Sequence, residues 1–380
     1  MSGERSPMPS GKQMLWWGRF DPAYSRNGVV RQHLAALGWT LRDFHPAVCA
    51  WGDLEAALRR IPAPDCVWVP CFRQRDLAAA RRWCGRRGVP LVFDPLISAY
   101  DKQVWERFKL REASPAARKL LVWERGLFAL ADLVIADTPC HAAFFRETLG
   151  VPEEKLRVVY VGADETFFRP APARAPSSPM DVLFYGSFIP LHGAQTIIEA
   201  ARIYQGPPVR WSLLGDGPAR PACRKAAAGL ANVFFEDRIP YAALPDRIRR
   251  ADILLGVFGT TRKAGRVIPN KVFQALAAGR PVITRVSDAY PAEARASEAL
   301  EFVPPGEPQA LAGAVAAWAA RRERLPARGR AARVQYEALF SADAIRRQLD
   351  DALVSLPRRR GGAEKKEPPH GGYSRYPRIR

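Results

Sequence analysis

The most constraining feature of this 380-residue chain is a regular alternation of short apolar segments with stretches of helical spacing. The apolar segments are rich in β-branched and aromatic residues and run through both halves as MLWW, DCVWVP, PLVFD, ADLVIAD, RVVYVG, DVLFYG, RWSLLG, NVFFE, ADILLGVFG, PVITR and EFVPP. Helical spacing separates them at residues 31–37, 54–60, 77–87, 194–203, 244–250 and 271–278. This alternation predicts βαβ units, and therefore an α/β protein built on parallel sheets.

The middle of the chain carries a break between two such runs. Residues 170–179 read PAPARAPSSP, which can continue neither a helix nor a strand. Because the length suits two domains of roughly 150–200 residues, we predict two Rossmann-like doubly wound domains that face a central cleft. The expected segments are a polar extension over 1–12, an N-terminal domain over 13–172, a linker over 173–180, a C-terminal domain over 181–340, a C-terminal helix over 341–356 whose return to the first domain is left open, and a disordered basic tail over 357–380.

The chain is strongly basic, with 58 Lys and Arg residues against 38 Asp and Glu residues and a net charge of +20. Phosphate-rich ligands, nucleic acid and anionic lipid would all be attracted, while a coding bias toward arginine explains most of the excess equally well. The most apolar stretch, residues 120–136, contains Glu124, Arg125 and Asp132, so neither secretion nor a membrane span is expected. We expect a cytoplasmic protein, with attachment of the basic tail to the anionic inner face of the membrane as an open alternative.

Several conspicuous residues have an ordinary structural explanation. We expect a set of tryptophans to be core or interface aromatics, namely Trp16, Trp17, Trp51, Trp68 and Trp83. The arginine pairs 59–60, 81–82 and 86–87 are expected on solvated helix faces, with anionic lipid as the alternative. His141 is expected at the start of a helix. No C-x-x-C pair occurs and the histidines lack acidic partners at metal spacing, so no bound metal is expected.

The segment VIPNKVFQALAAGRPVIT, residues 267–284, is the most informative in the chain. Pro269 and Asn270 suit a helix N-terminus, whose free N–H groups favour an anion, and Lys271 adds a full positive charge at the same end. Gly279 would end the helix in a left-handed turn. An ordinary helix–strand unit explains the glycine and prolines but not the lysine. We therefore expect this helix end to point into the groove between the domains and to hold a phosphate.

Two glycine-containing loops follow predicted strands. In FYGSFIPLHG, Gly186 and Gly193 would bring backbone N–H groups near a ligand, and Ser187 and His192 could donate hydrogen bonds, although a plain strand–helix turn is the alternative. In LLGDGP, the loop of Gly215 and Asp216 would line the pocket at the carboxyl edge of the sheet. It lacks the third glycine of a dinucleotide fingerprint.

Together these motifs resemble the large retaining family 4 of GT-B glycosyltransferases. The strongest element is KVFQALAAGRPVIT, which is similar to the family's K-x-x-E-x-x-A-x-G-x-P-V-I stretch. Other recurring pieces of the family resemble LLGDGP, VGADETFFRP, DPAYSRNGVVRQHLAALGW, VFDPLISAYDK and ADLVIADTPCH. The resemblance extends from near Asn27 to about Ala317. The resemblance implies a GT-B fold and transfer, with retention, of a hexose-type sugar from a nucleotide diphosphate donor bound mainly by the second domain. The acceptor, whether glycan, lipid or small molecule, stays unidentified.

Roles carried over by position give a candidate site. The donor diphosphate would face Lys271, Ser187 and His192. Gln274 stands where the family keeps a glutamate for the ribose hydroxyls, and Arg266 where its first glutamate contacts the sugar. The resemblance also implies charge neutralisation by Arg262 and Lys263, and an acceptor side formed by Ser25, Arg26 and Asn27.

The expected chemistry needs no metal and no cofactor besides the donor. No D-x-D occurs, so the usual carboxylate anchor for a divalent ion is missing and protein cations would stabilise the departing diphosphate. Lys271 is the principal catalytic candidate. Asp94 is a supporting candidate, because it ends a strand where the family often has a cleft-facing histidine, and its alternative is a turn residue before Pro95.

Three other functions compete with this hypothesis. A nucleotide-sugar epimerase would share the donor site, and a non-catalytic GT-B scaffold would explain why Arg266 and Gln274 replace two acids. A nucleic-acid-binding protein would explain the sequence pI of about 10.2. Because the charge is dispersed and no recognition module is present, we expect no specific nucleic acid partner.

Overall fold

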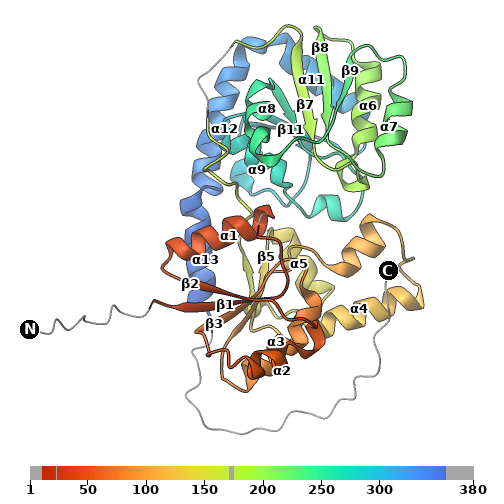
Figure 1. Cartoon of the computed structure of the whole chain (residues 1–380). Helices are drawn as coiled ribbons and strands as arrows, with labels where there is room; N and C mark the ends of the chain where they lie inside the picture. The colour runs from red at the N-terminus through yellow and green to blue at the C-terminus, as the bar shows by residue number, and fades with distance from the viewer. Residues whose placement is uncertain (1–10, 23, 171–174, 357–380) are drawn as a thin grey trace, which may run out of the picture.

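The structure is a computed structural model that describes residues 11–22, 24–170 and 175–356. Two domains lie one above the other, and the last helices run along one side of both (Figure 1). Three predicted segments fall wholly or partly outside the described residues. They are the polar extension up to residue 10, the linker where it overlaps 171–174, and the basic tail from 357 onward.

The N-terminal domain is built on a six-stranded parallel sheet in the order β2-β1-β3-β4-β5-β6. Its strands are β1 Gln13–Trp17, β2 Thr40–Phe44, β3 Cys66–Val69, β4 Leu91–Phe93, β5 Leu133–Ala136 and β6 Leu156–Val158. Its main helices are α1 Ser25–Ala36, α2 Gly52–Leu58, α3 Leu77–Gly85, α4 Pro115–Phe128 and α5 Pro139–Glu147, with a π-helical segment η3 at Asp101–Glu106. Apart from the edge strand β2, the strands are short apolar runs, as expected where helices cover both faces of a parallel sheet.

The C-terminal domain repeats this architecture with the strand order β12-β11-β10-β7-β8-β9, again parallel throughout. Its strands are β7 Met180–Tyr185, β8 Val209–Leu214, β9 Val233–Glu236, β10 Ile253–Leu255, β11 Val282–Arg285 and β12 Leu300–Val303. Its helices are α6 Ala194–Ile203, α7 Arg220–Ala226, α8 Leu244–Arg250, α9 Asn270–Ala277, α10 Ala292–Arg295, α11 Pro308–Ala320 and α12 Leu325–Leu339. The predicted class of two doubly wound, Rossmann-like domains is confirmed.

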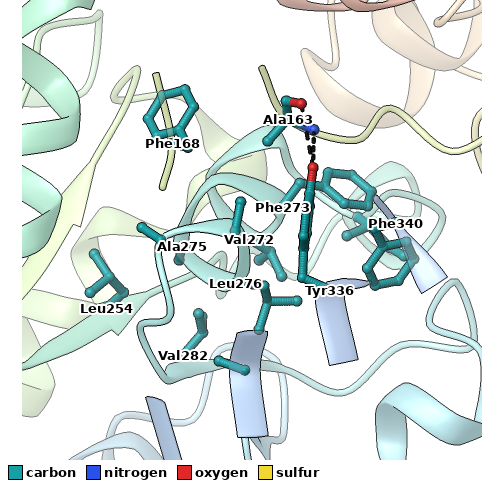
Figure 2. Packing of buried hydrophobic residues seen from close by; sticks show 14 of the residues in the cluster. Ala163, Phe168, Leu254, Val272, Phe273, Ala275, Leu276, Val282, Tyr336 and Phe340 are labelled. Carbon is teal, nitrogen blue, oxygen red and sulfur yellow. Dashed lines mark hydrogen bonds between the residues drawn. The ribbon is translucent and has the colours of Figure 1, made fainter. Parts of the chain in front are cut away.

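The two domains share hydrophobic packing. Helix α9 is buried in a cluster that also holds Phe168, which lies before the linker, and Tyr336 and Phe340 at the end of α12 (Figure 2). The Tyr336 hydroxyl accepts a hydrogen bond of 3.3 Å from the backbone N–H of Ala163. This packing fixes the helix that carries Lys271 against the segments that join the domains.

The last helix, α13 Ala342–Val354, packs on α1 of the first domain. Ile345 and Leu349 lie in the same buried cluster as Met14 and Leu34. The chain therefore returns to the N-terminal domain. None of the helices in the described part of the chain is both long enough and apolar enough to cross a membrane.

Candidate active site

Lys271, at the start of α9, is a buried cation without a hydrogen-bond partner. Its side chain is about 6% exposed, and Nζ has no hydrogen-bond partner among the described residues. The ammonium lies over the Phe184 ring, 3.9 Å from the centroid. Burial lowers the pKa of Lys271 well below that of an ordinary lysine. An anion beside this amine would supply the partner that the protein does not provide.

The loop from Gly186 to His192 covers the amino end of α9. Gly186 has φ +143°, and a Cβ built there would lie 3.1 Å from Lys271 Nζ and 3.1 Å from His192 Cε1. A Cβ at Gly215 would lie 2.1 Å from the Gly186 carbonyl oxygen. The two predicted glycine loops therefore press against each other and against the lysine. Asn270, at the start of the same helix, is half-buried.

His192 does not have the hydrogen bonding expected from the sequence. Its Nδ1 bonds to the Ser187 carbonyl oxygen, so this nitrogen carries the proton and Nε2 is left as an acceptor in the neutral ring. Burial and the neighbouring Lys271 charge lower the pKa of His192 well below its usual value. A neutral His192 in this arrangement cannot donate to a phosphate, while the Ser187 side chain stays exposed on the loop.

Asp216 and Gly193 act here through the backbone. The Asp216 carbonyl accepts a 2.9 Å hydrogen bond from Phe188 N–H, while the residue itself is exposed. A Cβ at Gly193 would lie 2.5 Å from the Gly259 backbone nitrogen, so only glycine fits between these loops. Both residues shape the loops that cover Lys271.

Gln274 lies one turn after Lys271 and already has a protein partner. Its Oε1 accepts a hydrogen bond of 3.1 Å from the Tyr185 hydroxyl, which also lies 2.9 Å from the Lys271 carbonyl oxygen. Burial raises the pKa of Tyr241, whereas the side chains of Gln274 and Ser25 lower it. Ser25, from the predicted acceptor side, and Gln274, from the predicted donor side, thus meet at Tyr241 across the domain boundary.

Three ion pairs join the domains beside this site, and we call them the clasp. They are Arg262–Glu112 at 3.3 Å, Lys263–Glu106 at 2.5 Å and Arg266–Asp101 at 2.8 Å. The Lys263–Glu106 pair is almost completely buried. The sequence suggested Arg262 and Lys263 as cations for the donor. In the structure their charges are already matched by N-terminal carboxylates, because the domain arrangement brings η3 against Lys263–Gly265.

A buried histidine network extends the clasp, and no sequence pattern pointed to it. The Asp101 carboxylate that binds Arg266 also lies 3.8 Å from His141 Nε2, and His141 Nδ1 bonds to Asp137. Burial alone would lower the pKa of His141, but the carboxylates of Asp137 and Asp101 raise it to about 9. His141 is also a helix-start residue, since its N–H donates to the Thr138 side chain that caps α5.

The remaining predicted residues lie within the N-terminal domain core. Arg26 is fully buried, forms a 2.9 Å ion pair with Asp94, and donates to the carbonyl oxygens of Val159 and Tyr160. The Asn27 amide donates to the Asp21 carbonyl at 2.9 Å. Burial raises the pKa of Asp94, against the influence of Arg26. The Arg26–Asp94 pair and the Asn27 amide thus have protein partners, while Arg26 Nη2 and Asp94 Oδ1 are buried without a hydrogen-bond partner among the described residues.

A cavity of about 590 Å³ lies elsewhere, between α1, the segment before the linker, and the helices α12 and α13. Its lining contains none of the predicted donor residues and consists of Gln32, His33, Ala36, Glu165, Thr166, Arg169, Pro170, Arg333, Ala342 and Arg346. Among the described residues, no group of three or more His, Cys, Asp or Glu side chains could hold a metal ion.

Comparison with known proteins matches both halves of the chain. Residues 12–162 match the family described as Glycosyl transferase 4-like domain, and residues 179–321 match Glycosyl transferases group 1. The chain is 25% identical over 301 residues to the putative colanic acid biosynthesis glycosyltransferase WcaL of Escherichia coli strain K12, covering 72% of this chain and 73% of WcaL. It is 32% identical over 199 residues to D-inositol 3-phosphate glycosyltransferase of Thermobispora bispora, covering 46% and 44%.

Solved structures share the fold at lower identity. Sucrose-phosphate synthase from Thermosynechococcus elongatus has a TM-score of 0.70 at 20% identity, covering 91% of this chain and 99% of the other. Anabaena Alr3699/HepE in complex with UDP-glucose has a TM-score of 0.67 at 16% identity, covering 90% and 100%.

Proposed function

Since this chain belongs to the group 1 glycosyltransferases of family 4 and has their GT-B fold, we propose that it moves a hexose-type sugar, with retention, from a nucleoside diphosphate donor to a glycan, lipid or small-molecule acceptor. One observation carries the donor half of this proposal: the buried, unpartnered ammonium of Lys271 at the start of α9. The family does not favour the epimerase or the nucleic-acid-binding alternative.

Lys271 would act on the leaving group. As the bond between sugar and diphosphate breaks, negative charge grows on the phosphate oxygens, and a preorganised cation stabilises that charge more in the transition state than in the ground state. The departing phosphate oxygen takes the acceptor proton, so no separate protein base is needed. Asp94, paired with Arg26, would then contribute by holding the domain that presents the acceptor.

Access to Lys271 requires movement of the covering loop. Lys271 is only about 6% exposed, and Gly186 lies directly against its side chain. We therefore propose that donor binding displaces the loop 186–192 and brings the diphosphate against the Lys271 amine. The clasp stays formed during this movement, since its cations already have partners in the first domain.

Transfer is proposed to need no metal. The chain has no D-x-D, and Lys271 supplies positive charge where a divalent ion would otherwise act. Full transfer activity in excess EDTA is expected, and activity that requires added Mg²⁺ or Mn²⁺ would contradict the proposal.

The nucleotide is tested by thermal shift with UDP, GDP and ADP, since a ligand that binds the native state raises the melting temperature. UDP is the first probe because Anabaena HepE binds UDP-glucose. Stabilisation of the wild type by one nucleotide, and not of Lys271→Met, is expected. Equal stabilisation of both proteins would remove Lys271 from the site. Tight binding with no release of the nucleotide from any donor sugar would favour the non-catalytic scaffold.

Association with anionic membranes through the tail 357–380, which lies outside the described residues, remains part of the proposal. Deletion of the tail should weaken sedimentation with anionic vesicles and leave chemistry on a soluble acceptor unchanged. Equal vesicle binding by both forms would reject this role.

A further inference from the structure

A stripe of large apolar side chains faces solvent on the outer side of α2 and the turn before it. Trp51 is 67% exposed, Leu54 55% and Leu58 84%, and Val48 in the preceding turn is 49% exposed. The sequence predicted Trp51 to be a core or interface aromatic, and the structure excludes it from the core of this chain. Three large apolar residues on one exposed face mark an interaction surface rather than a folding requirement.

Helix geometry explains why these side chains point outward together. Leu54 and Leu58 are four residues apart and share one face of α2, and Trp51, which ends the short 3-10 turn Cys49–Trp51, precedes them as the N-cap residue. The opposite face is occupied by Gly52 and Ala56, both buried. A Cβ at Gly52 would lie 3.0 Å from the Trp17 ring, so the inner face already fits closely on the domain core. The outer stripe contributes nothing to that packing.

Arginines flank the stripe at both ends. Near its start, Arg82 and Arg86 of the adjacent α3 region reach Asp53 at 2.7 and 3.2 Å. At its end, Arg59 pairs with Glu55 at 2.7 Å and Arg60 is exposed. These four arginines outnumber the two carboxylates, Asp53 and Glu55, which leaves an excess of two positive charges around the apolar stripe.

We propose that this surface, which we call the α2 face (Val48, Trp51, Leu54 and Leu58 with the four flanking arginines), docks on a bilayer of anionic phospholipid. Apolar side chains beside cations suit the boundary of a membrane, where the former enter the acyl region and the latter bind headgroup phosphates. A second copy of the chain is a poorer partner, because a symmetric contact would bring two positive faces together. The inference does not depend on the proposed transfer reaction, and it assigns membrane binding to the folded domain in addition to the tail.

The test is flotation of the full-length protein with vesicles of phosphatidylcholine alone or of phosphatidylcholine with 40% phosphatidylglycerol. The triple variant Trp51→Ser, Leu54→Ser, Leu58→Ser should lose at least tenfold in partitioning to anionic vesicles. A matched control is Val334→Ser with Val354→Ser, whose side chains are 66% and 77% exposed on other helices. That control should bind like the wild type. All three proteins should share one melting temperature, since the replaced side chains are exposed.

Quenching by brominated lipid gives a second measurement. Trp51→Phe should float normally but lose the quenching seen in the wild type, because the other proposed contacts carry no indole. Unchanged flotation of the triple variant would overturn the proposal. So would unchanged quenching of Trp51→Phe, or a wild-type dimer that the triple variant dissociates without any effect on vesicle binding.

Discussion

Replacing Lys271 with methionine should stabilise the free protein while it removes donor binding. The ammonium is buried against Phe184 and has no hydrogen-bond partner among the described residues. Leaving a buried polar group unsatisfied costs about 1–3 kcal/mol, and the contact with the aromatic ring returns up to about 2 kcal/mol of it. Methionine has nearly the same length and fills the same space without the charge. We expect the free energy of unfolding to rise by about 1 kcal/mol.

The stability gain should depend on pH in a defined direction. The pKa of Lys271 is lower in the folded than in the unfolded chain. Above the ordinary lysine pKa of about 10.4 the amine is neutral in both states, so its protonation no longer affects stability. As pH falls below that value, the unfolded chain takes up the proton first, so the wild type loses stability relative to the methionine variant. The gain should therefore be larger at pH 7 than at pH 10.

The affinity for the donor should fall in Lys271→Met, whereas the free energy of unfolding rises. A unit charge about 4 Å from a phosphate charge contributes about 4 kcal/mol at an effective dielectric constant of about 20. Loss of one such stabilising group typically lowers kcat by about 10²–10³-fold. Urea unfolding would measure stability, and calorimetric titration with UDP would measure affinity. A variant that is less stable than the wild type, with undiminished affinity for every nucleotide tried, would refute the reasoning.

Three further outcomes are expected. Gly186→Ala should lower both the melting temperature and the donor affinity, because the added methyl group meets Lys271 Nζ at 3.1 Å. The control Gly229→Ala, also at positive φ but with nothing within 4 Å, should change stability only. Similar losses of donor affinity in the two variants would contradict this expectation. Glu106→Gln leaves the buried Lys263 amine without its counter-charge, so the free energy of unfolding, measured by urea titration, should fall by about 3–5 kcal/mol. A loss below about 1 kcal/mol would show that the clasp is dispensable for stability. Donor affinity of the wild type should fall as pH rises toward the ordinary lysine pKa of about 10.4, because the diphosphate binds the protonated amine; a pH-independent dissociation constant would count against Lys271 as the contact.

The fold could be predicted from the sequence because central parallel strands are nearly continuous apolar runs. Strand β2 was missed for the same reason: TLRDF is an edge strand, four of its five residues are at least half-exposed, and it therefore lacks the apolar signature. The start of α9 and the need for glycine at positions 186 and 215 could also be predicted from the sequence, because proline favours the first turn of a helix and glycine adopts conformations that other residues avoid.

The pairing of charges could not be predicted. Arg266 and Asp101 are 165 positions apart, and Lys263 and Glu106 are 157 apart, so their contact depends on how the two domains meet. The sequence identified His192 as a loop residue, but not that Nδ1 would bond to the Ser187 carbonyl. The outward orientation of Trp51 could not be predicted either, because it depends on which face of α2 packs on the domain core.

The return of α13 to the first domain has a consequence for synthesis on the ribosome. The layer formed by α1 needs Ile345 and Leu349 to be complete, and these residues emerge only after the entire second domain has been translated. Until then the nascent first half carries an uncovered apolar surface. A premature stop codon before residue 342 would therefore damage the domain made first as well as the one made last.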